Sequence, residues 1–310
     1  MQVAQAFAGL DSSHTSIDAA RFVILPVPYE ATTEWLSGTR HAPDRIIESS
    51  RLLELYDHEL NRDISRAGIA TAPAIQPVLS GPESMVARVK DEVSHWLSRG
   101  KIPVLLGGEH TITLGAVQAM RAKYADLSVL HLDAHADLRD EYLGARCSQA
   151  TVMRRVRELC PAAQMGVRAI SEAERTYVDE NRLPVVFWPP TSDCWIEDVL
   201  EALSNTVYVT IDADVFDSAI LPSVGTPEPD GPGWQDVWSL LRAVAGSRHI
   251  AGFDVVELAP EGRLGDVCAY TLAKLIYRLI GYIQMHNEQR EASNSGRISD
   301  NDQREASNHG

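Results

Sequence analysis

The chain has 310 residues, of which 45% are hydrophobic and 23% are charged, and its formal net charge is −15. This length provides a sizeable core, and the acidic balance argues against nucleic-acid binding, which requires a basic surface. No hydrophobic run approaches the roughly 20 residues that span a bilayer, and the N-terminus lacks a secretory signal, so we expect a cytoplasmic protein that binds no membrane. The four cysteines form no CxxC pair, which argues against a disulfide framework and a structural zinc site.

Short apolar runs rich in β-branched residues alternate with longer segments of helical spacing. In chain order we expect strand Phe22–Val27, helix Pro82–Leu97, strand Pro103–Leu106, helix Leu114–Tyr124, strand Ser128–Leu132, helix Thr151–Leu159, strands Gln164–Val167 and Val185–Phe187, helix Trp195–Leu203, strand Val207–Ile211, helix Trp234–Val244, strand Ile250–Val256 and helix Ala269–Tyr282. Near-continuous hydrophobic strands are typical of a parallel sheet that is buried on both faces. The alternation therefore predicts a single doubly wound α/β domain.

Composition divides the chain into an N-terminal extension (residues 1–20), one domain (residues 21–286) and a polar tail (residues 287–310). The tail contains a repeat, because NEQREASNSG at 287–296 returns as NDQREASNHG at 301–310. Small polar residues of this kind cannot bury a core, so we expect the tail to be disordered. The alternative is an arm that becomes ordered only on a neighbouring subunit.

Ionisable residues follow several of the predicted strands directly, and ligands of open α/β sheets bind beyond the carboxyl ends of the strands. Asp133, His135 and Asp137 alternate with alanines, so in extended backbone their side chains share one face. Carboxylates and imidazoles crowded in this way require a cation between them. With the residues that follow two further strands, the candidate metal ligands are His110, Asp133, His135, Asp137, Asp212 and Asp214.

Four carboxylates and two imidazoles carry too much negative charge for one ion and suit two divalent cations. Two ions about 3.5–4 Å apart hold a water molecule between them and lower its pKa toward neutrality. Oxygen-rich ligation with some imidazole favours Mn²⁺, and Ni²⁺ is the main alternative. A single DxD or a single histidine would carry little weight, because such residues also occur at ordinary strand ends. The complete set of six predicts a metal centre.

Four blocks in sequence resemble the signatures of the ureohydrolase family of arginases and agmatinases. They are GGEHTIT (107–113), LDAHADL (132–138), IDADVFDSAILPSVGTPEPDG (211–231) and FDVVELAP (253–260). The resemblance is closest to bacterial agmatinases and extends from about Phe22 to Ile283. It implies a three-layer α/β/α sandwich around a central parallel sheet of about eight strands, and it implies homo-trimers or hexamers.

The resemblance also assigns roles to individual residues. One metal ion would be held by His110, Asp133, Asp137 and Asp212, and the other by Asp133, His135, Asp212 and Asp214. Glu257 would bind the guanidinium group of a small cationic substrate, since carboxylates form bidentate pairs with guanidinium groups. Thr226, with Glu228 in the same loop, would shape the pocket. A metal-bridging hydroxide would attack the guanidinium carbon, and urea and an amine would be released.

One position departs from the family pattern. Relatives carry a histidine in a Tyr-Ser-His-Ala segment shortly after DAHAD, whereas this chain has Gln149 in CSQA (147–150). Glutamine forms hydrogen bonds but cannot shuttle a proton. We therefore assign proton transfer to Asp137 or solvent and expect Gln149 to reshape the pocket. Arg146 either faces solvent or attracts a carboxylate on the substrate tail, which would favour a guanidino acid over agmatine.

Three functions of different classes are compatible with these residues. The first is a hydrolase that releases urea from agmatine, guanidinobutyrate or another guanidine derivative. The second is a formimino or amide hydrolase on the same fold, which releases no urea. The third is a weakly active companion subunit in a hetero-oligomer with a paralogue that hydrolyses guanidine or a biguanide. Because all six predicted metal ligands are present, the first is favoured.

Overall fold

The fold is built on a central parallel sheet. The computed structural model describes residues 6–10 and 16–307, with side chains up to residue 293. Within this part of the chain, eight strands form the sheet in the order β4-β1-β5-β10-β9-β6-β7-β8, and all neighbouring strands are parallel. The strands are β1 (Phe22–Val27), β4 (Ile69–Thr71), β5 (Ile102–Gly107), β6 (Leu127–Leu132), β7 (Ala162–Val167), β8 (Val185–Phe187), β9 (Thr206–Asp212) and β10 (His249–Val256).

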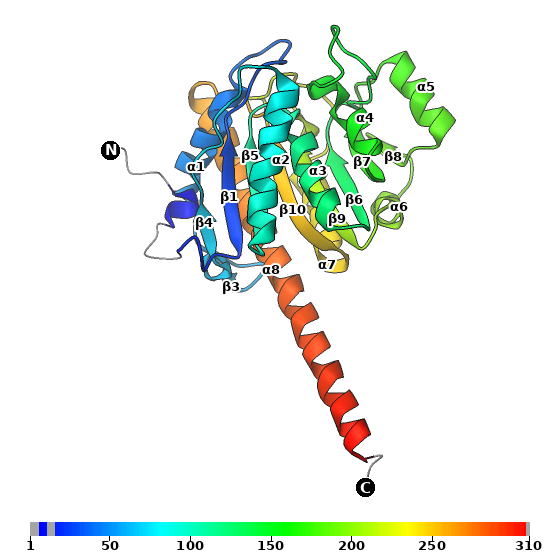
Figure 1. Cartoon of the computed structure of the whole chain (residues 1–310). Coiled ribbons are helices and arrows are strands. Elements are labelled where there is room, and N and C mark those ends of the chain that lie inside the picture. Colours follow the sequence, from blue (N-terminus) through cyan, green and yellow to red (C-terminus); the bar gives the residue numbers. More distant parts are fainter. Residues whose placement is uncertain (1–5, 11–15, 308–310) are drawn as a thin grey trace.

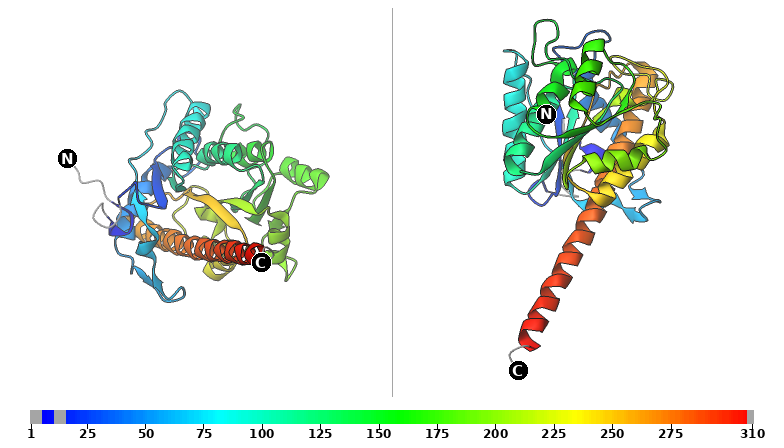
Figure 2. Two further views of the ribbon diagram at one scale, coloured as in Figure 1. Left: turned by 60° about the horizontal axis from the view of Figure 1, so that its bottom comes forward. Right: turned by 90° about the vertical axis from the view of Figure 1, so that its right-hand side faces the viewer.

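Helices cover both faces of this sheet (Figures 1 and 2). One face packs against α1 (Ala42–Ser50), α6 (Trp195–Ala202), α7 (Trp234–Ser247) and α8 (Gly262–Ser307). The other packs against α2 (Pro82–Ser98), α3 (Ile112–Lys123), α4 (Val152–Arg157) and α5 (Glu172–Asn181). The predicted three-layer sandwich is therefore confirmed.

Alternation of side chains along each strand produces two separate cores. In β1, Phe22 and Ile24 belong to the core under α1 and α8, whereas Val23, Leu25 and Val27 belong to the core under α2 and α3. All residues of β1 are buried, because neither face of the strand meets solvent. This explains why the strands read as continuous hydrophobic runs instead of alternating ones.

The elements that the sequence patterns miss are short or mostly polar. Strand β4 has three residues at the edge of the sheet, and a separate hairpin pairs β2 (Tyr56–Asp57) with β3 (Arg62–Asp63). Helix α5 buries only Glu174 and Val178 of its ten residues, so its apolar periodicity is weak. Tertiary packing, and not local pattern, defines these elements.

Part of the predicted N-terminal extension belongs to the core. Phe7 and Leu10 are buried, and the backbone N–H of Phe7 donates to Thr71 Oγ1 at 2.9 Å. The other prediction for the termini concerned a disordered tail from residue 287. Among the described residues, helix α8 reaches Ser307, within the second copy of the repeat, and projects from the domain (Figure 1), and the disorder of the tail stays a prediction. Among the described residues, no helix combines the length and apolar character needed to cross a bilayer.

Candidate metal centre

Four adjacent strands bring the predicted site residues to one edge of the sheet. Strands β5, β10, β9 and β6 are neighbours in that order, and Leu106, Val255, Ile211 and Leu132 lie opposite one another near their carboxyl ends. The segments that carry the candidate ligands follow these four residues directly. Parallel pairing therefore collects side chains that are up to about 150 positions apart in the sequence, as expected for ligand sites of open α/β sheets.

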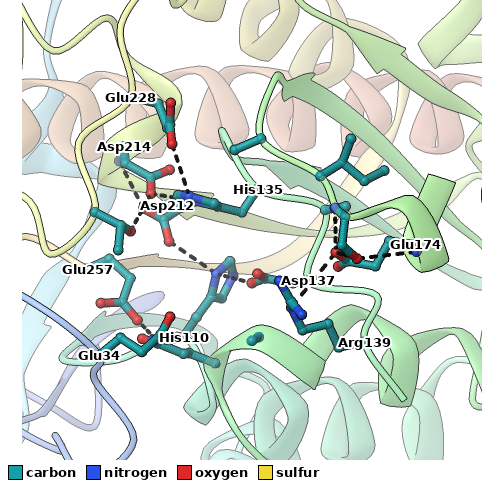
Figure 3. A pocket seen from close by; sticks show the side chains of 17 residues that line it. Glu34, His110, His135, Asp137, Arg139, Glu174, Asp212, Asp214, Glu228 and Glu257 are labelled. Carbon is teal, nitrogen blue, oxygen red and sulfur yellow. Dashed lines mark hydrogen bonds and ion pairs between the residues drawn. The ribbon is translucent and has the colours of Figure 1, made fainter. Parts of the chain in front are cut away.

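His110 lies at the centre of the first group of ligands (Figure 3). Its Nδ1 atom lies 3.2 Å from Asp133 Oδ2, 3.3 Å from Asp137 Oδ2 and 3.2 Å from Asp212 Oδ2. His110 and Asp133 are buried, and only 11% of the Asp137 side chain is exposed. The three carboxylates thus converge on one imidazole nitrogen inside the protein.

His135 is the centre of a second group that shares Asp133 with the first. Its Nδ1 atom lies 2.9 Å from Asp214 Oδ2 and 3.5 Å from Asp133 Oδ1. Asp133 therefore presents one oxygen to each group, and the six predicted ligands lie together. This arrangement provides two adjoining positions for cations with a carboxylate between them.

Charge is crowded at this centre. Burial, together with the carboxylates of Asp214 and Asp133, raises the pKa of Asp212 well above its ordinary value. Burial and Asp133 raise the pKa of Asp137 to about 7. Burial opposes protonation of His110, but its contacts with Asp133, Asp137 and Asp212 raise its pKa well above the usual value. Positive charge is thus strongly favoured here, whether it is supplied by protons or by metal ions.

Hydrogen bonding orients His110 for metal ligation. Thr210 Oγ1 donates to Asp254 Oδ1 at 2.6 Å, so it accepts from His110 Nε2 at 2.8 Å. This leaves Nδ1 to face the carboxylates. Among the described residues, His110 Nδ1 and Asp133 Oδ2 are buried without a hydrogen-bond partner. Unpartnered buried polar atoms are costly, and a divalent cation between these two would satisfy both, so the residues fit a metal ion.

Two residues of the site have backbone conformations that are rare outside glycine. The φ angles of Asp137 and Glu257 are 53° and 61°. Each is held by backbone hydrogen bonds, since Asp137 O accepts from Met153 N at 3.0 Å and Glu257 N donates to Gly108 O at 2.8 Å. Such conformations cost on the order of 1–3 kcal/mol each and concentrate at functional sites.

Gly108 allows two strand ends to approach closely. A Cβ atom at this position would lie 1.9 Å from the carbonyl oxygen of Tyr29, so no other residue fits without moving the backbone. The approach lets Gly108 N donate to Val27 O at 3.0 Å and leaves Gly108 O to accept from Glu257 N. The glycine therefore ties the loop after β5 to β1 on one side and to Glu257 on the other.

A cavity of about 320 Å³ opens beside the metal ligands. Glu257 lines it, with its Oε1 atom accepting from His110 N at 2.6 Å. Burial, together with the charge of Glu109, raises the pKa of Glu257 well above its usual value. The wall also contains Glu34, Glu174 and Glu228, against a single basic residue, Arg139 (Figure 3). The cavity is thus suited to a cationic ligand.

The structure brings most of the predicted pocket residues to this cavity, but not all. Gln149 and Thr226 line it, and Thr226 Oγ1 donates to Asp214 Oδ2 at 3.3 Å. Arg146 does not, because its side chain is 61% exposed and pairs with Asp140 at 3.3 Å. The hypothesis of a substrate carboxylate bound by Arg146 therefore loses its support.

Sequence reasoning assigned no role to three contributors. Thr210 and Asp254 lie inside apolar strand runs and read as incidental polar residues. Arg168 follows β7, and its guanidinium group donates to six carbonyl oxygens, mostly in the loops that carry Asp214 and Glu228. Asp254 lies within the FDVVELAP block that resembles the family, and a polar residue inside or just after a hydrophobic strand is a signal that all three share.

We expect replacement of Arg168 by methionine to destabilise the protein by about 3 kcal/mol, because several buried carbonyl groups lose a charged donor. The melting temperature should fall by roughly 5–10 °C in differential scanning calorimetry. Replacement of Arg51, an exposed residue, provides the control and should change stability by less than about 0.5 kcal/mol. Equal melting temperatures for the Arg168→Met variant and the wild type would contradict the assignment.

Comparison with known proteins agrees with the geometry. The model of the arginase family matches residues 20–281. The N(1)-aminopropylagmatine ureohydrolase of Synechocystis is 38% identical over 280 residues, which cover 86% of this chain and 90% of the relative. The agmatinase of Pyrococcus horikoshii is 33% identical over 269 residues, or 86% and 93% of the two chains. The solved agmatine ureohydrolase of Thermoplasma volcanium superposes with a TM-score of 0.80 at 31% identity, covering 88% of this chain and 92% of that one.

The sheet topology defines an α/β protein with a carboxylate–histidine cluster beside an acidic cavity, and the chain belongs to the arginase family. Within that family it is an agmatinase-like ureohydrolase, a hydrolase that acts on amidino C–N bonds. The predicted family and enzyme class are thereby confirmed.

Proposed function

We propose that this enzyme hydrolyses a guanidino compound whose tail carries a second positive charge, such as agmatine or N1-aminopropylagmatine, and releases urea and an amine. The observation that carries the proposal is the acidic cavity wall. Beyond the predicted metal ligands, four glutamates line the cavity against one arginine. Arg139 is itself placed beside a glutamate, with its Nε 3.9 Å from Glu174 Oε2. A substrate carboxylate would thus meet negative charge without a free basic partner at the wall.

The guanidinium group is assigned to Glu257. Its Oε1 atom is oriented by the backbone N–H of His110, which leaves the second carboxylate oxygen for the substrate. A guanidinium group offers only donors, and a buried carboxylate offers only acceptors, so the pair is complementary in charge and geometry. Binding also restores the charged state of Glu257, whose pKa burial raises in the free protein.

Two further carboxylates of the cavity wall, Glu34 and Glu228, lie where they could meet the substrate tail. Glu34 comes from the loop after β1 and contacts the hydroxyl of Tyr142. Glu228 lies on the loop after β9, with Oε1 3.9 Å from His135 Nε2. These two carboxylates are the proposed partners of the tail amine, and a longer polyamine tail would engage both. The names of the relatives from Synechocystis and Pyrococcus support the same class of substrate.

The residues that would hold two divalent cations are the His110 group and the His135 group, with Asp133 and Asp212 shared between them. When bound, such cations supply Lewis-acid polarisation and lower the pKa of water. Oxygen-rich ligation supports Mn²⁺, with Ni²⁺ as the alternative. The chain's own residues orient the substrate: Glu257 would hold the guanidinium group, and Thr226 Oγ1 donates to Asp214 Oδ2 at the cavity wall.

Urea release by the purified protein, reloaded separately with Mn²⁺ and Ni²⁺, tests the proposal. Agmatine and N1-aminopropylagmatine should be hydrolysed, and guanidinobutyrate, which replaces the tail amine by a carboxylate, should react at least 10-fold more slowly. The Glu34→Gln and Glu228→Gln variants should have a higher KM for agmatine and N1-aminopropylagmatine. The ratio of their rates to the rate of guanidinobutyrate should therefore fall. Equal rates for agmatine and guanidinobutyrate would refute the proposed preference for a substrate with a cationic tail. No urea from any compound, in protein that holds two ions per chain, would favour the formimino hydrolase or the companion subunit.

Gln149 leads to a prediction about proton transfer. Replacing it by histidine places a group with an ordinary pKa near 6.5 at the cavity wall, and general acid–base groups contribute about 10²–10⁴-fold when well placed. We expect kcat for the best substrate to rise about tenfold, with a new limb between about pH 6 and 7 in its pH profile. Gln149→Asn, which cannot titrate, should show no such limb. A Gln149→His profile identical to that of the wild type would contradict a role in proton transfer.

The resemblance to agmatinases also supports a homo-trimer or hexamer. Light scattering coupled to size-exclusion chromatography measures the mass directly. A monomer that remains inactive until a paralogous chain is added would support the hetero-oligomer instead.

A further inference from the structure

His131 is a buried histidine beside the metal centre that belongs neither to the six predicted ligands nor to the cavity wall. It lies in β6, two residues before Asp133, and its side chain has no exposed surface. Its ring stacks on that of His110, with centroids 5.1 Å apart. Its Nε2 atom lies 2.9 Å from Asp133 Oδ2, although Nε2 and Oδ2 form no well-aligned hydrogen bond. By position alone, His131 could either ligate a metal ion or support Asp133.

The two roles require different tautomers. A ligand needs a lone pair on Nε2, whereas a support for Asp133 needs a proton there. The donor or acceptor at the opposite nitrogen decides which form is present. Gln164 lies across from His131 in the pairing of β6 with β7, and its Nε2 atom lies 3.0 Å from His131 Nδ1.

The orientation of the Gln164 amide is determined by two further partners. Its Nε2 atom donates to the carbonyl oxygen of Ala136 at 2.8 Å, and its Oε1 atom accepts from Arg157 Nη2 at 3.1 Å. Turning the amide over would place oxygen against the Ala136 carbonyl and an NH₂ group against the guanidinium. Burial lowers the pKa of Arg157 to about 10, so Arg157 remains a cationic donor at neutral pH. The amide nitrogen therefore faces His131.

We propose that the Arg157–Gln164 pair holds His131 in the Nε2–H tautomer, so that His131 is a positioning residue for the metal ligand Asp133 and is not itself a ligand. Gln164 donates one amide hydrogen to Ala136 and the other to His131 Nδ1, which must then carry the lone pair. The proton consequently lies on Nε2, facing Asp133. The inference rests on the proposed two-metal centre, and it concerns which side chains bind the ions and which orient them.

The orienting proton has a specific consequence for Asp133, which presents one oxygen to each ligand group. Its Oδ1 atom accepts from His135 N at 2.6 Å, and its Oδ2 atom lies beside His131 and His110. A donor on the Oδ2 side fixes the plane of the carboxylate, so that both oxygens present lone pairs toward the cations. Partners of this kind change metal affinity by about 10–100-fold when they are removed.

The tautomer can be read directly in the wild-type protein. Labelling the histidine rings with ¹⁵N and loading the protein with Zn²⁺, a diamagnetic probe, allows the two-bond ¹H–¹⁵N spectrum to separate protonated, unprotonated and metal-bound nitrogens. The His131 signals are assigned by their loss in a His131→Gln variant. We expect Nε2 to be protonated and Nδ1 to be bare. A metal-bound Nε2, or a proton on Nδ1, would overturn the proposal.

Metal affinity provides the second readout, measured by calorimetric titration with Mn²⁺. Glutamine places an amide N–H close to the Nε2 position, so His131→Gln should stay within about threefold of the wild type, whereas His131→Leu should bind about 10–100-fold more weakly. The control is His249→Leu, a histidine outside the site, which should bind as the wild type does. Unchanged binding by His131→Leu, or an equal loss in His131→Gln, would refute the positioning role.

Neither measurement uses substrate. A result that refutes the positioning role of His131 is therefore distinct from a result that refutes the proposed function. Wild-type protein that binds fewer than two ions would refute the two-metal centre itself. Wild-type protein that binds two ions, with Nε2 of His131 metal-bound, would refute only the positioning role of His131. If His131→Leu does not fold, the spectrum of the wild type and the His131→Gln titration still decide the question.

Discussion

Replacing Asp212 by asparagine should abolish urea release and metal-induced stabilisation, yet make the metal-free protein more stable at pH 8. The amide keeps the bond in which Asp212 Oδ1 accepts from Asp214 N at 2.8 Å. Its NH₂ group takes the place of Oδ2, 3.2 Å from His110 Nδ1, and matches the carboxylate in size and shape. The substitution therefore removes the charge of one predicted ligand with little change in packing.

The sign of the stability change follows from the pKa shift. Burial and the charges of Asp214 and Asp133 raise the pKa of Asp212 in the folded protein above its unfolded value near 3.9. The folded state therefore binds the proton more tightly, and stability is lost as pH rises from about 4 through the raised pKa. Asparagine removes this loss. We expect the metal-free variant to be more stable than the wild type at pH 8 and to approach the wild type at pH 4.

Thermal melts with and without Mn²⁺ measure both the metal-induced stabilisation and the stability of the metal-free protein. A metal ion at about 1,000 times its dissociation constant stabilises the wild type by about 4 kcal/mol, or roughly 10 °C. The Asp212→Asn variant should show almost none of this increase. Asp217→Asn is the matched control, because Asp217 follows the same strand but caps the backbone N–H groups of Ala219 and Gly231 outside the ligand set. Full metal-induced stabilisation of Asp212→Asn would disprove its role as a shared ligand.

Replacing Glu257 by glutamine should lower kcat/KM by about 10³-fold while leaving metal binding intact. Glutamine can still accept from His110 N through Oε1, so the loop geometry is preserved. Its NH₂ group, however, faces a guanidinium group that also only donates, and the charge that attracts the cation is lost. Loss of a buried charged partner costs about 4 kcal/mol, which corresponds to this factor.

Steady-state kinetics and metal analysis together test this prediction. Glu261→Gln, an exposed position four residues further along, should behave as the wild type. A fall of less than tenfold would show that Glu257 does not bind the guanidinium group. Loss of the metal ions from the variant would show instead that Glu257 supports the centre structurally.

Most of the candidate metal centre could be predicted because its candidate ligands lie close to strand ends. DAHAD (133–137) and DAD (212–214) follow buried strands directly, and parallel strands place their carboxyl ends at one edge of the sheet. The pairing of β6 with β9, which the sequence does not specify, then brings these two segments together. Local pattern and this general property of parallel sheets were sufficient to select the candidate ligands, and the strand order decided which of them are neighbours.

The cavity wall and the surroundings of the ligands could not be predicted in the same way. Arg146 and Gln149 are three positions apart, yet one is exposed beside Asp140 and the other lines the cavity. His131 reads as a polar residue in an apolar strand until its neighbour on β7 is known. These properties depend on side-chain direction and on register between strands, which one sequence does not specify.

The sequence by itself determined the fold class, the family resemblance and the six candidate ligands. Continuous apolar strands require burial on both faces, and clustered carboxylates and imidazoles require a cation. The fold class and the candidate ligands therefore follow from the composition of short segments. Only the tertiary structure decided that Asp133 presents one oxygen to each ligand group, that the cavity wall is acidic and that Gln164 orients His131. These are contacts between residues far apart in the chain, and their geometry arises only when the strands pair.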